Sequence, residues 1–78
     1  MIPKKNRLII AFHSTHDAIA FEAACEKSGA GGRLIPLPKE ISAGCGLAWS
    51  ADPEDQQKMI SLLESEEIKA EKIQVCII

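Results

Sequence analysis

A chain of 78 residues is long enough for one small domain, so we expect a single domain over residues 1–78. Hydrophobic residues make up 46% of the sequence and charged residues 26%, which is typical of a globular core and argues against disorder. The formal net charge is −2, and there are two phenylalanines, one tryptophan and no tyrosine. Nucleic-acid binding needs basic patches or base-stacking aromatics, so we expect no nucleic-acid partner.

The sequence also argues against a membrane or secreted protein. No apolar run approaches the roughly 20 residues of a membrane helix, and the start of the chain lacks the apolar core of a signal peptide. Three cysteines are an odd number without the spacing of a disulfide framework. We therefore expect a cytoplasmic protein in a reducing compartment, with no membrane partner.

The first predicted element is a strand over residues 7–14, rich in branched side chains. It is apolar on both faces, with Leu8, Ile10 and Phe12 on one face and Ile9 and Ala11 on the other. Such a pattern is typical of a central strand that is covered on both sides.

A helix is predicted next, up to Gly29. Ser14 or Thr15 can cap its start, and Lys27 in its last turn complements the helix dipole. Helical spacing predicts an inner stripe of Ala18, Phe21, Cys25 and Ser28.

The second half of the chain predicts two strands, a helix and a last strand. Residues 31–38 form a strand that its prolines confine to a sheet edge, and residues 45–51 form the next. Residues 52–55 read as a helix start, with an aspartate cap and a proline at the first position. The apolar side of that helix would be Met59, Ile60 and Leu63. Residues 71–78 form the final strand.

This βαββαβ order predicts an α+β, ferredoxin-like sandwich. Its antiparallel sheet would have the strand order 4-1-3-2, with both helices on one face. A βαβ fragment and a swapped hairpin are the alternatives, and both would leave more apolar surface uncovered. Because the helices cover one face only, the second apolar face of the first strand suggests a homodimer through the open sheet face.

Cys45 is the candidate functional residue, because it lies between Gly44 and Gly46 rather than in a packed element. In the predicted topology the start of the third strand meets the end of the first strand and the start of the first helix. Cys45 would then face the free N–H groups of a helix N-terminus, near Ser14, Thr15 and His16. A thiol in such a place has a lowered pKa and is a reactive thiolate.

Further residues at this end of the sheet could support a thiolate. His13 and Lys39 are expected there and could add positive charge, and Gly44 and Gly46 would let a partner's backbone approach. The alternative is a turn cysteine without a role, with the histidines as surface residues. A zinc site built from His13, His16 and Cys45 has no recognised ligand spacing, so we predict no metal and no cofactor.

The remaining residues have structural interpretations. Cys25 and Cys76 are expected in the core, too far from Cys45 for a disulfide within one monomer. Trp49 is expected in the core or in a dimer contact. The sequence of residues 29–32, GAGG, follows a helix rather than preceding one and is interpreted as a turn, not a phosphate loop. The acidic residues between Glu64 and Glu71 are interpreted as a solvated helix end.

Three stretches resemble one family of small bacterial proteins, which is labelled selenium/sulfur carrier-like. They are Phe12–Ala18 (FHSTHDA), Arg33–Pro38 (RLIPLP) and Ser42–Ala48 (SAGCGLA). The resemblance extends over nearly the whole chain. It implies that Cys45 carries sulfur or selenium as a persulfide or perselenide. It also implies a cysteine desulfurase-type donor and a selenium/sulfur acceptor protein as partners.

The sequence therefore predicts a carrier rather than an autonomous enzyme. In the alternative reading, the protein is a small regulatory or interaction module that binds an anion or a partner without thiol chemistry. Labelling of the thiol across pH would discriminate the two hypotheses, since the carrier needs Cys45 to ionise well below the usual thiol pKa.

Overall fold

The structure, a computed structural model, describes residues 6–41 and 46–77. Within these ranges a 3-10 turn, η1, precedes the second helix. The elements in chain order are β1 Asn6–Phe12, α1 Thr15–Ser28, β2 Arg33–Pro36, β3 Leu47–Ala51, η1 Pro53–Asp55, α2 Gln56–Ser65 and β4 Ala70–Ile77.

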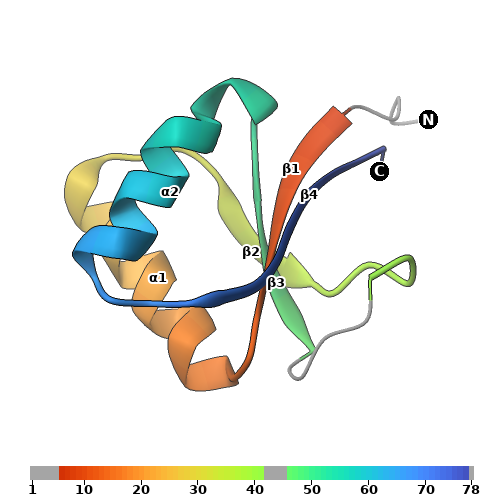
Figure 1. The fold of residues 1–78 in the computed structure, drawn as a ribbon, viewed down its shortest axis with the longest axis horizontal. Helices are drawn as coiled ribbons and strands as arrows, with labels where there is room; N and C mark the ends of the chain where they lie inside the picture. The colour runs from red at the N-terminus through yellow and green to blue at the C-terminus, as the bar shows by residue number, and fades with distance from the viewer. Residues whose placement is uncertain (1–5, 42–45, 78) are drawn as a thin grey trace.

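In the part of the chain that the structure describes, the four strands form one sheet in the order β2-β3-β1-β4, and every neighbouring pair is antiparallel. This is the predicted order 4-1-3-2 read from the other edge. α1 and α2 lie together on one face of the sheet (Figure 1). The predicted α+β, ferredoxin-like fold is confirmed.

The main core lies between the sheet and the helices. Phe21 of α1 is central to it: its ring is 5.6 Å from the ring of Phe12 and 5.6 Å, edge-on, from that of Trp49. The prediction of Trp49 and Cys25 as core residues is confirmed, because the exposed fractions of their surfaces are only 3% and 1%. The buried members of this core are Leu8, Ile10, Phe12, Ala18, Phe21, Cys25, Trp49, Ala51, Met59, Leu63 and Ile68.

The opposite face of the sheet was expected to be open along β1, but the structure covers it there. Ile9 and Ala11 are completely buried there, in a second cluster with Ile41 and Ala48. Residues 37–41 follow β2 and cross to the side of the sheet away from the helices (Figure 1), where Ile41 packs against β1. The chain itself therefore supplies the cover for which a partner was invoked, and this argument for a homodimer is wrong.

Several predicted boundaries move by a few residues. β1 ends at Phe12 rather than at residue 14, because Ser14 caps α1, and β2 begins at Arg33 rather than at residue 31. Ser28 was predicted on the inner stripe of α1 but is exposed, and its hydroxyl donates to the Cys25 carbonyl at 3.3 Å. Ala24 is buried in its place. No helix among the described residues is long and apolar enough to cross a membrane.

Candidate functional site

The end of β1, the start of α1 and the starts of β3 and β4 meet at one end of the sheet, here called the β1–α1 end. The sheet register establishes this, because Ala11 lies opposite Ala48 near the start of β3, and Phe12 lies opposite Ala70 at the start of β4. Gly46 directly precedes β3 and is exposed, and its carbonyl accepts a hydrogen bond from the Leu37 N–H at 2.9 Å. A Cβ added at Gly46 would meet no atom within 4 Å, so the space beside it is open.

Ser14 caps the helix that begins at this end. Its backbone is extended, and its hydroxyl accepts a hydrogen bond from the Asp17 N–H at 3.2 Å. The Ala18 N–H bonds the Ser14 carbonyl at 3.2 Å, which makes the first turn of the helix. The amides of Thr15 and His16 lie ahead of that turn, where a helix has no backbone acceptor of its own for them. The first turn of α1 therefore presents N–H donors to this end of the sheet.

The two histidines have carboxylate neighbours. His13 Nδ1 is 3.2 Å from Glu71 Oε1, and 58% of the His13 side chain is exposed. This contact ties the end of β1 to the start of β4. His16 is almost fully exposed, and its Nδ1 lies 3.8 Å from Asp17 Oδ1 on the same helix turn.

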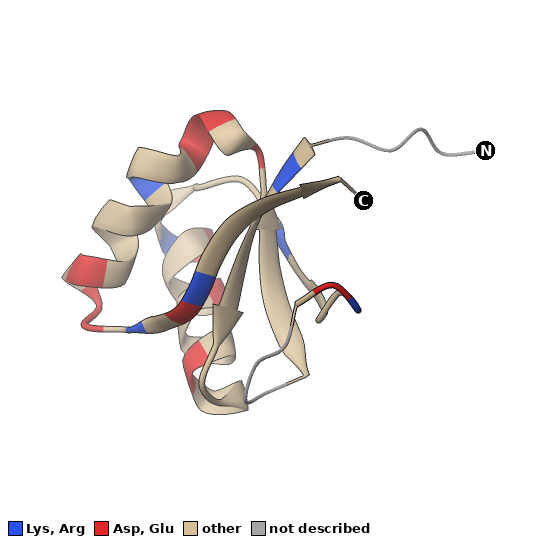
Figure 2. Ribbon diagram, turned by 45° about the vertical axis from the view of Figure 1, so that its right-hand side comes forward, with Lys and Arg blue, Asp and Glu red and all other residues tan. Residues whose placement is uncertain are grey.

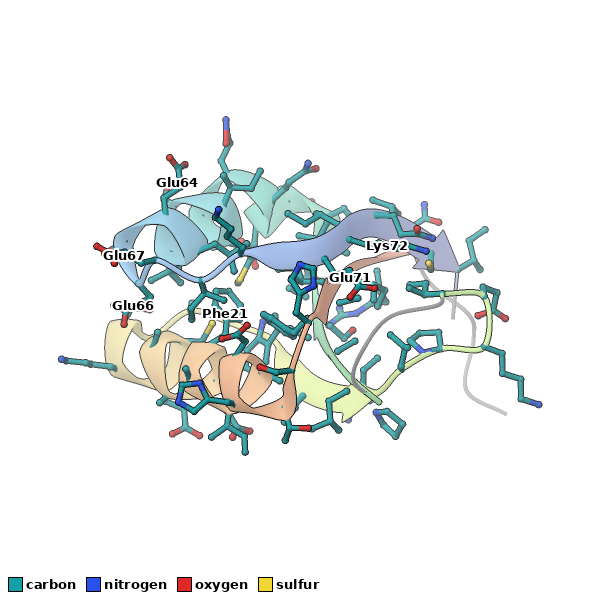
Figure 3. All side chains as sticks on the ribbon, turned by 60° about the horizontal axis from the view of Figure 1, so that its bottom comes forward. Phe21, Glu64, Glu66, Glu67, Glu71 and Lys72 are labelled. Carbon is teal, nitrogen blue, oxygen red and sulfur yellow. The ribbon has the colours of Figure 1, made fainter. Side chains whose placement is uncertain are left out.

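Glu71 was predicted as part of a solvated acidic helix end. Glu64, Glu66 and Glu67 do gather at the exposed end of α2 (Figure 3), whereas Glu71 belongs to β4 and contacts His13. The topology alone could have identified this partner, since an antiparallel fourth strand must begin where the first strand ends.

Lys39 was predicted to help at the site. It is exposed and belongs to residues 37–41, a segment that runs on the side of the sheet opposite α1 (Figure 1). The structure thus brings Ser14, Thr15 and His16 to the end of the sheet where Gly46 lies, and it places Lys39 on a segment beyond the other face. Leu37 of that segment bonds Gly46, a contact that no sequence motif signals.

Cys45 and Gly44 lie outside the described residues, and so does any geometry that they would share with His13 or His16. Among the residues that the structure does describe, no group of three or more His, Cys, Asp or Glu side chains could hold a metal ion.

The other two cysteines have defined environments. Cys25 is buried in the helix-side core, and burial raises its thiol pKa to about 11. Cys76, on the outer face of β4, is partly buried and packs against the outer cluster, so it lies at the margin of a core rather than inside one. Its sulfur accepts a hydrogen bond from Gln74 Nε2 at 3.2 Å. It lies opposite Arg7 at the start of β1, and so at the far end of the sheet from Gly46.

Comparison with known protein families decides the relationship that the motifs suggested. The sequence model of the family described as "Putative Se/S carrier protein-like" matches residues 7–74 of the chain. The chain belongs to this Se/S carrier-like family. No curated protein and no solved structure matches it.

The Se/S carrier-like match contains all the residues of the candidate site. It runs from the start of β1 to Gln74 in β4, and it includes the segment with Cys45 and the first turn of α1. Cys76 lies beyond the matched range. The family region therefore includes two of the three cysteines, and one of these two, Cys25, is buried.

Proposed function

We propose that this protein carries sulfur or selenium on the Cys45 thiol, between a donor of the cysteine desulfurase type and an acceptor protein. The observation that carries the proposal is the match of the Se/S carrier-like family to residues 7–74, which include Cys45. A carrier of this kind is a vehicle and catalyses no net reaction alone.

The environments of the other thiols support the choice of Cys45. The Cys25 thiol is buried and has a raised pKa, so it is neither accessible nor ionised near neutral pH. Cys76 is partly covered, accepts a hydrogen bond from Gln74 and lies outside the family region. Gly46, the residue after Cys45, is exposed and has open space beside it, which a large partner would need.

The proposed chemistry is a transfer of one sulfane sulfur. The Cys45 thiolate attacks the outer sulfur of the donor's persulfide, a new S–S bond forms, and the donor's own S–S bond breaks. The donor cysteine leaves as a thiolate with the bonding electron pair, so no external oxidant or reductant is needed. The same step in reverse, with the acceptor's thiolate as nucleophile, unloads the carrier. Selenium would follow the same balance.

The N-terminus of α1 lies at the β1–α1 end and would stabilise a thiolate there. The amides of Thr15 and His16 and the positive end of the α1 dipole favour a nearby anion. In this proposal they stabilise the thiolate and the persulfide anion of Cys45, and His16 adds positive charge when protonated. His13, held by Glu71, is available for the same purpose.

The test is mass spectrometry of the intact protein after incubation with a cysteine desulfurase and cysteine. We expect the wild-type protein to gain the mass of sulfur, with the adduct mapped to Cys45 by proteolysis. Cys45→Ser should fold normally and gain none, because the nucleophile is gone. Cys76→Ser is the matched control, since it removes a partly exposed thiol at the far end of the sheet and should load normally.

Two results would contradict the proposal. Equal loading of Cys45→Ser and wild-type protein would show that another thiol takes the sulfur. Failure of the wild-type protein to load from any desulfurase, together with alkylation of Cys45 at an ordinary thiol pKa, would favour a binding module without thiol chemistry.

A further inference from the structure

β4 is the longer of the two edge strands. Within residues 6–41 and 46–77 it pairs with β1 alone, so half of its backbone N–H and C=O groups point away from the sheet. It has eight residues and no proline. β2, at the other edge, has four residues, of which Pro36 is the last, and short edges with proline resist pairing. Of these two edges, β4 is the one suited to accept another strand.

The helix-side face of β4 is also apolar and exposed. Ile73, Val75 and Ile77 are 38%, 49% and 66% exposed. Ile73 lies opposite Ile10, and Val75 lies opposite Leu8. Their side chains are therefore on the same sheet face as the helix-side core, but they remain exposed to solvent. The charged residues of β4 are confined to its start, and the rest of the strand carries none (Figure 2). A strand that extends this sheet would bury the exposed row.

We propose that this edge binds a second copy of the same chain, through antiparallel pairing of β4 with β4 about a two-fold axis at Val75. An axis perpendicular to the sheet keeps the helices of both copies on one face, and it requires that facing residues have the same parity. With Val75 opposite Val75, Ile73 of each copy lies opposite Ile77 of the other. All the exposed apolar residues of β4 then meet apolar residues across the interface.

Registers with the axis nearer the start of β4 fit less well. With the axis at Gln74, Ile77 would lie opposite Glu71. With the axis at Ile73, Glu71 would lie opposite Val75. Both registers also extend the pairing into the β-bulge at the start of β4, where the pairing with β1 shifts by one residue. The register at Val75 avoids the bulge and leaves no carboxylate opposite an apolar side chain.

Charge also favours this arrangement over parallel pairing of β4 with β4. Parallel, in-register pairing would place Lys72 on Lys72 and Glu71 on Glu71, and like charges opposite each other are destabilising. In the proposed pairing the two Lys72 residues lie at opposite ends of the paired region. The β1–α1 ends of the two copies also lie at opposite ends of the joined sheet, so the dimer leaves both proposed carrier sites open.

The test is the oligomeric state of the full chain by sedimentation velocity, from micromolar to millimolar concentration. One strand pair is smaller than a standard interface of about 800 Å² per partner, so a weak, concentration-dependent dimer is expected. Val75→Glu should abolish the dimer, because two carboxylates would face each other on the axis. Ile19→Glu is the matched control: Ile19 lies on α1 and is 53% exposed, and its replacement should leave the dimer intact.

Mixing of charged variants tests the register. Val75→Glu and Val75→Lys should each be monomeric and should form a heterodimer when mixed, since Val75 faces itself only in this register. Val75→Glu mixed with Ile73→Lys should not associate. Circular dichroism verifies the fold of each variant. If Val75→Glu fails to fold, Ile77→Glu, at a more exposed position, replaces it in the test of dimer loss, because it would place a carboxylate opposite Ile73 of the other copy.

The proposal is overturned if the wild-type chain is monomeric throughout the concentration range. A monomer would mean that residues 1–5 cover the β4 edge or that the edge binds a different protein, and either case contradicts the proposal. It is also overturned if Val75→Glu leaves the dimer intact, or if Val75→Glu pairs with Ile73→Lys. None of these measurements involves sulfur transfer, so the dimer and the carrier proposal stand or fall separately.

Discussion

At Gly32 the neighbouring residues leave no room for a side chain. Its φ is +116°, and a Cβ built there would lie 2.5 Å from Trp49 Nε1 and 2.7 Å from the Ser50 carbonyl oxygen. The Trp49 indole is buried against this backbone, and its N–H has no hydrogen-bond partner among the described residues. Gly32 thus lets the chain pass directly over the tryptophan on its way into β2.

Three glycines in one turn allow a graded test of this requirement. Gly32→Ala should lower the free energy of unfolding by at least about 2 kcal/mol, because it adds both a clash and an unfavourable φ. Gly29→Ala should cost about 1 kcal/mol, since Gly29 has a φ of +74° but open space. Gly31→Ala, without either problem, should stay within about 0.5 kcal/mol. Urea unfolding measures all three, and equal effects at Gly31 and Gly32 would contradict the contact with Trp49.

At the scale of elements, the start of α1 joins stability to the proposed chemistry. The Ser14 hydroxyl accepts a hydrogen bond from the Asp17 N–H and so fixes the orientation of the first turn. The capped turn contains the Thr15 and His16 amides that the carrier proposal requires. A loss of the cap should therefore affect both the helix and the site.

Ser14→Ala should reduce the free energy of unfolding by about 1 kcal/mol, the usual cost of removing an N-cap acceptor. It should also slow sulfur loading of Cys45, because the first turn of α1 frays. Thr15→Ala is the control: Thr15 is exposed in the same turn without a capping contact to lose, so we expect little change in either quantity. Chemical denaturation and the rate of persulfide formation are the two measurements. A stable cap variant that loads at the wild-type rate would remove the helix end from the mechanism.

The elements of this fold were predictable because each has a local signal. Apolar residues on both faces identify β1 as central, Ser14 and Gly29 bound α1, and the prolines confine β2 to an edge. The cover over the second face of the sheet was not predictable, because residues 37–41 contain only Leu37 and Ile41 as apolar residues in a polar turn. Their burial depends on long-range packing against β1, which no local pattern encodes. The contact of Glu71 with His13 was missed for another reason: the predicted topology already brings the start of β4 to the end of β1, but Glu71 was interpreted as part of a solvated helix end.

At the scale of the whole molecule, β1 is the shared wall of two apolar clusters. The larger cluster lies under the helices, and the smaller one lies under residues 37–41. Within the described residues, a bond from the Ile41 N–H to the Pro38 carbonyl at 3.0 Å closes a turn in the covering segment, and a bond from the Leu37 N–H to the Gly46 carbonyl at 2.9 Å joins the segment to the residue before β3. The segment therefore connects the outer cluster to the start of β3, beside the proposed carrier residue. If this segment unfolds together with the sheet, the proposed site belongs to the same cooperative unit as the rest of the protein.

Truncation of one side chain in each cluster tests whether the molecule unfolds as one unit. Ile41→Ala and Leu63→Ala remove side chains that are 4% and 5% exposed, from opposite faces of the sheet. Each should cost about 2–4 kcal/mol in one shared cooperative transition, and the two losses should be nearly additive because the residues share no contact. Denaturant unfolding gives these values, and hydrogen exchange of residues 37–41 reports local opening. If Ile41→Ala speeds exchange in that segment while the global free energy stays unchanged, the cover opens on its own and the proposed site is coupled to a local motion instead of to the fold.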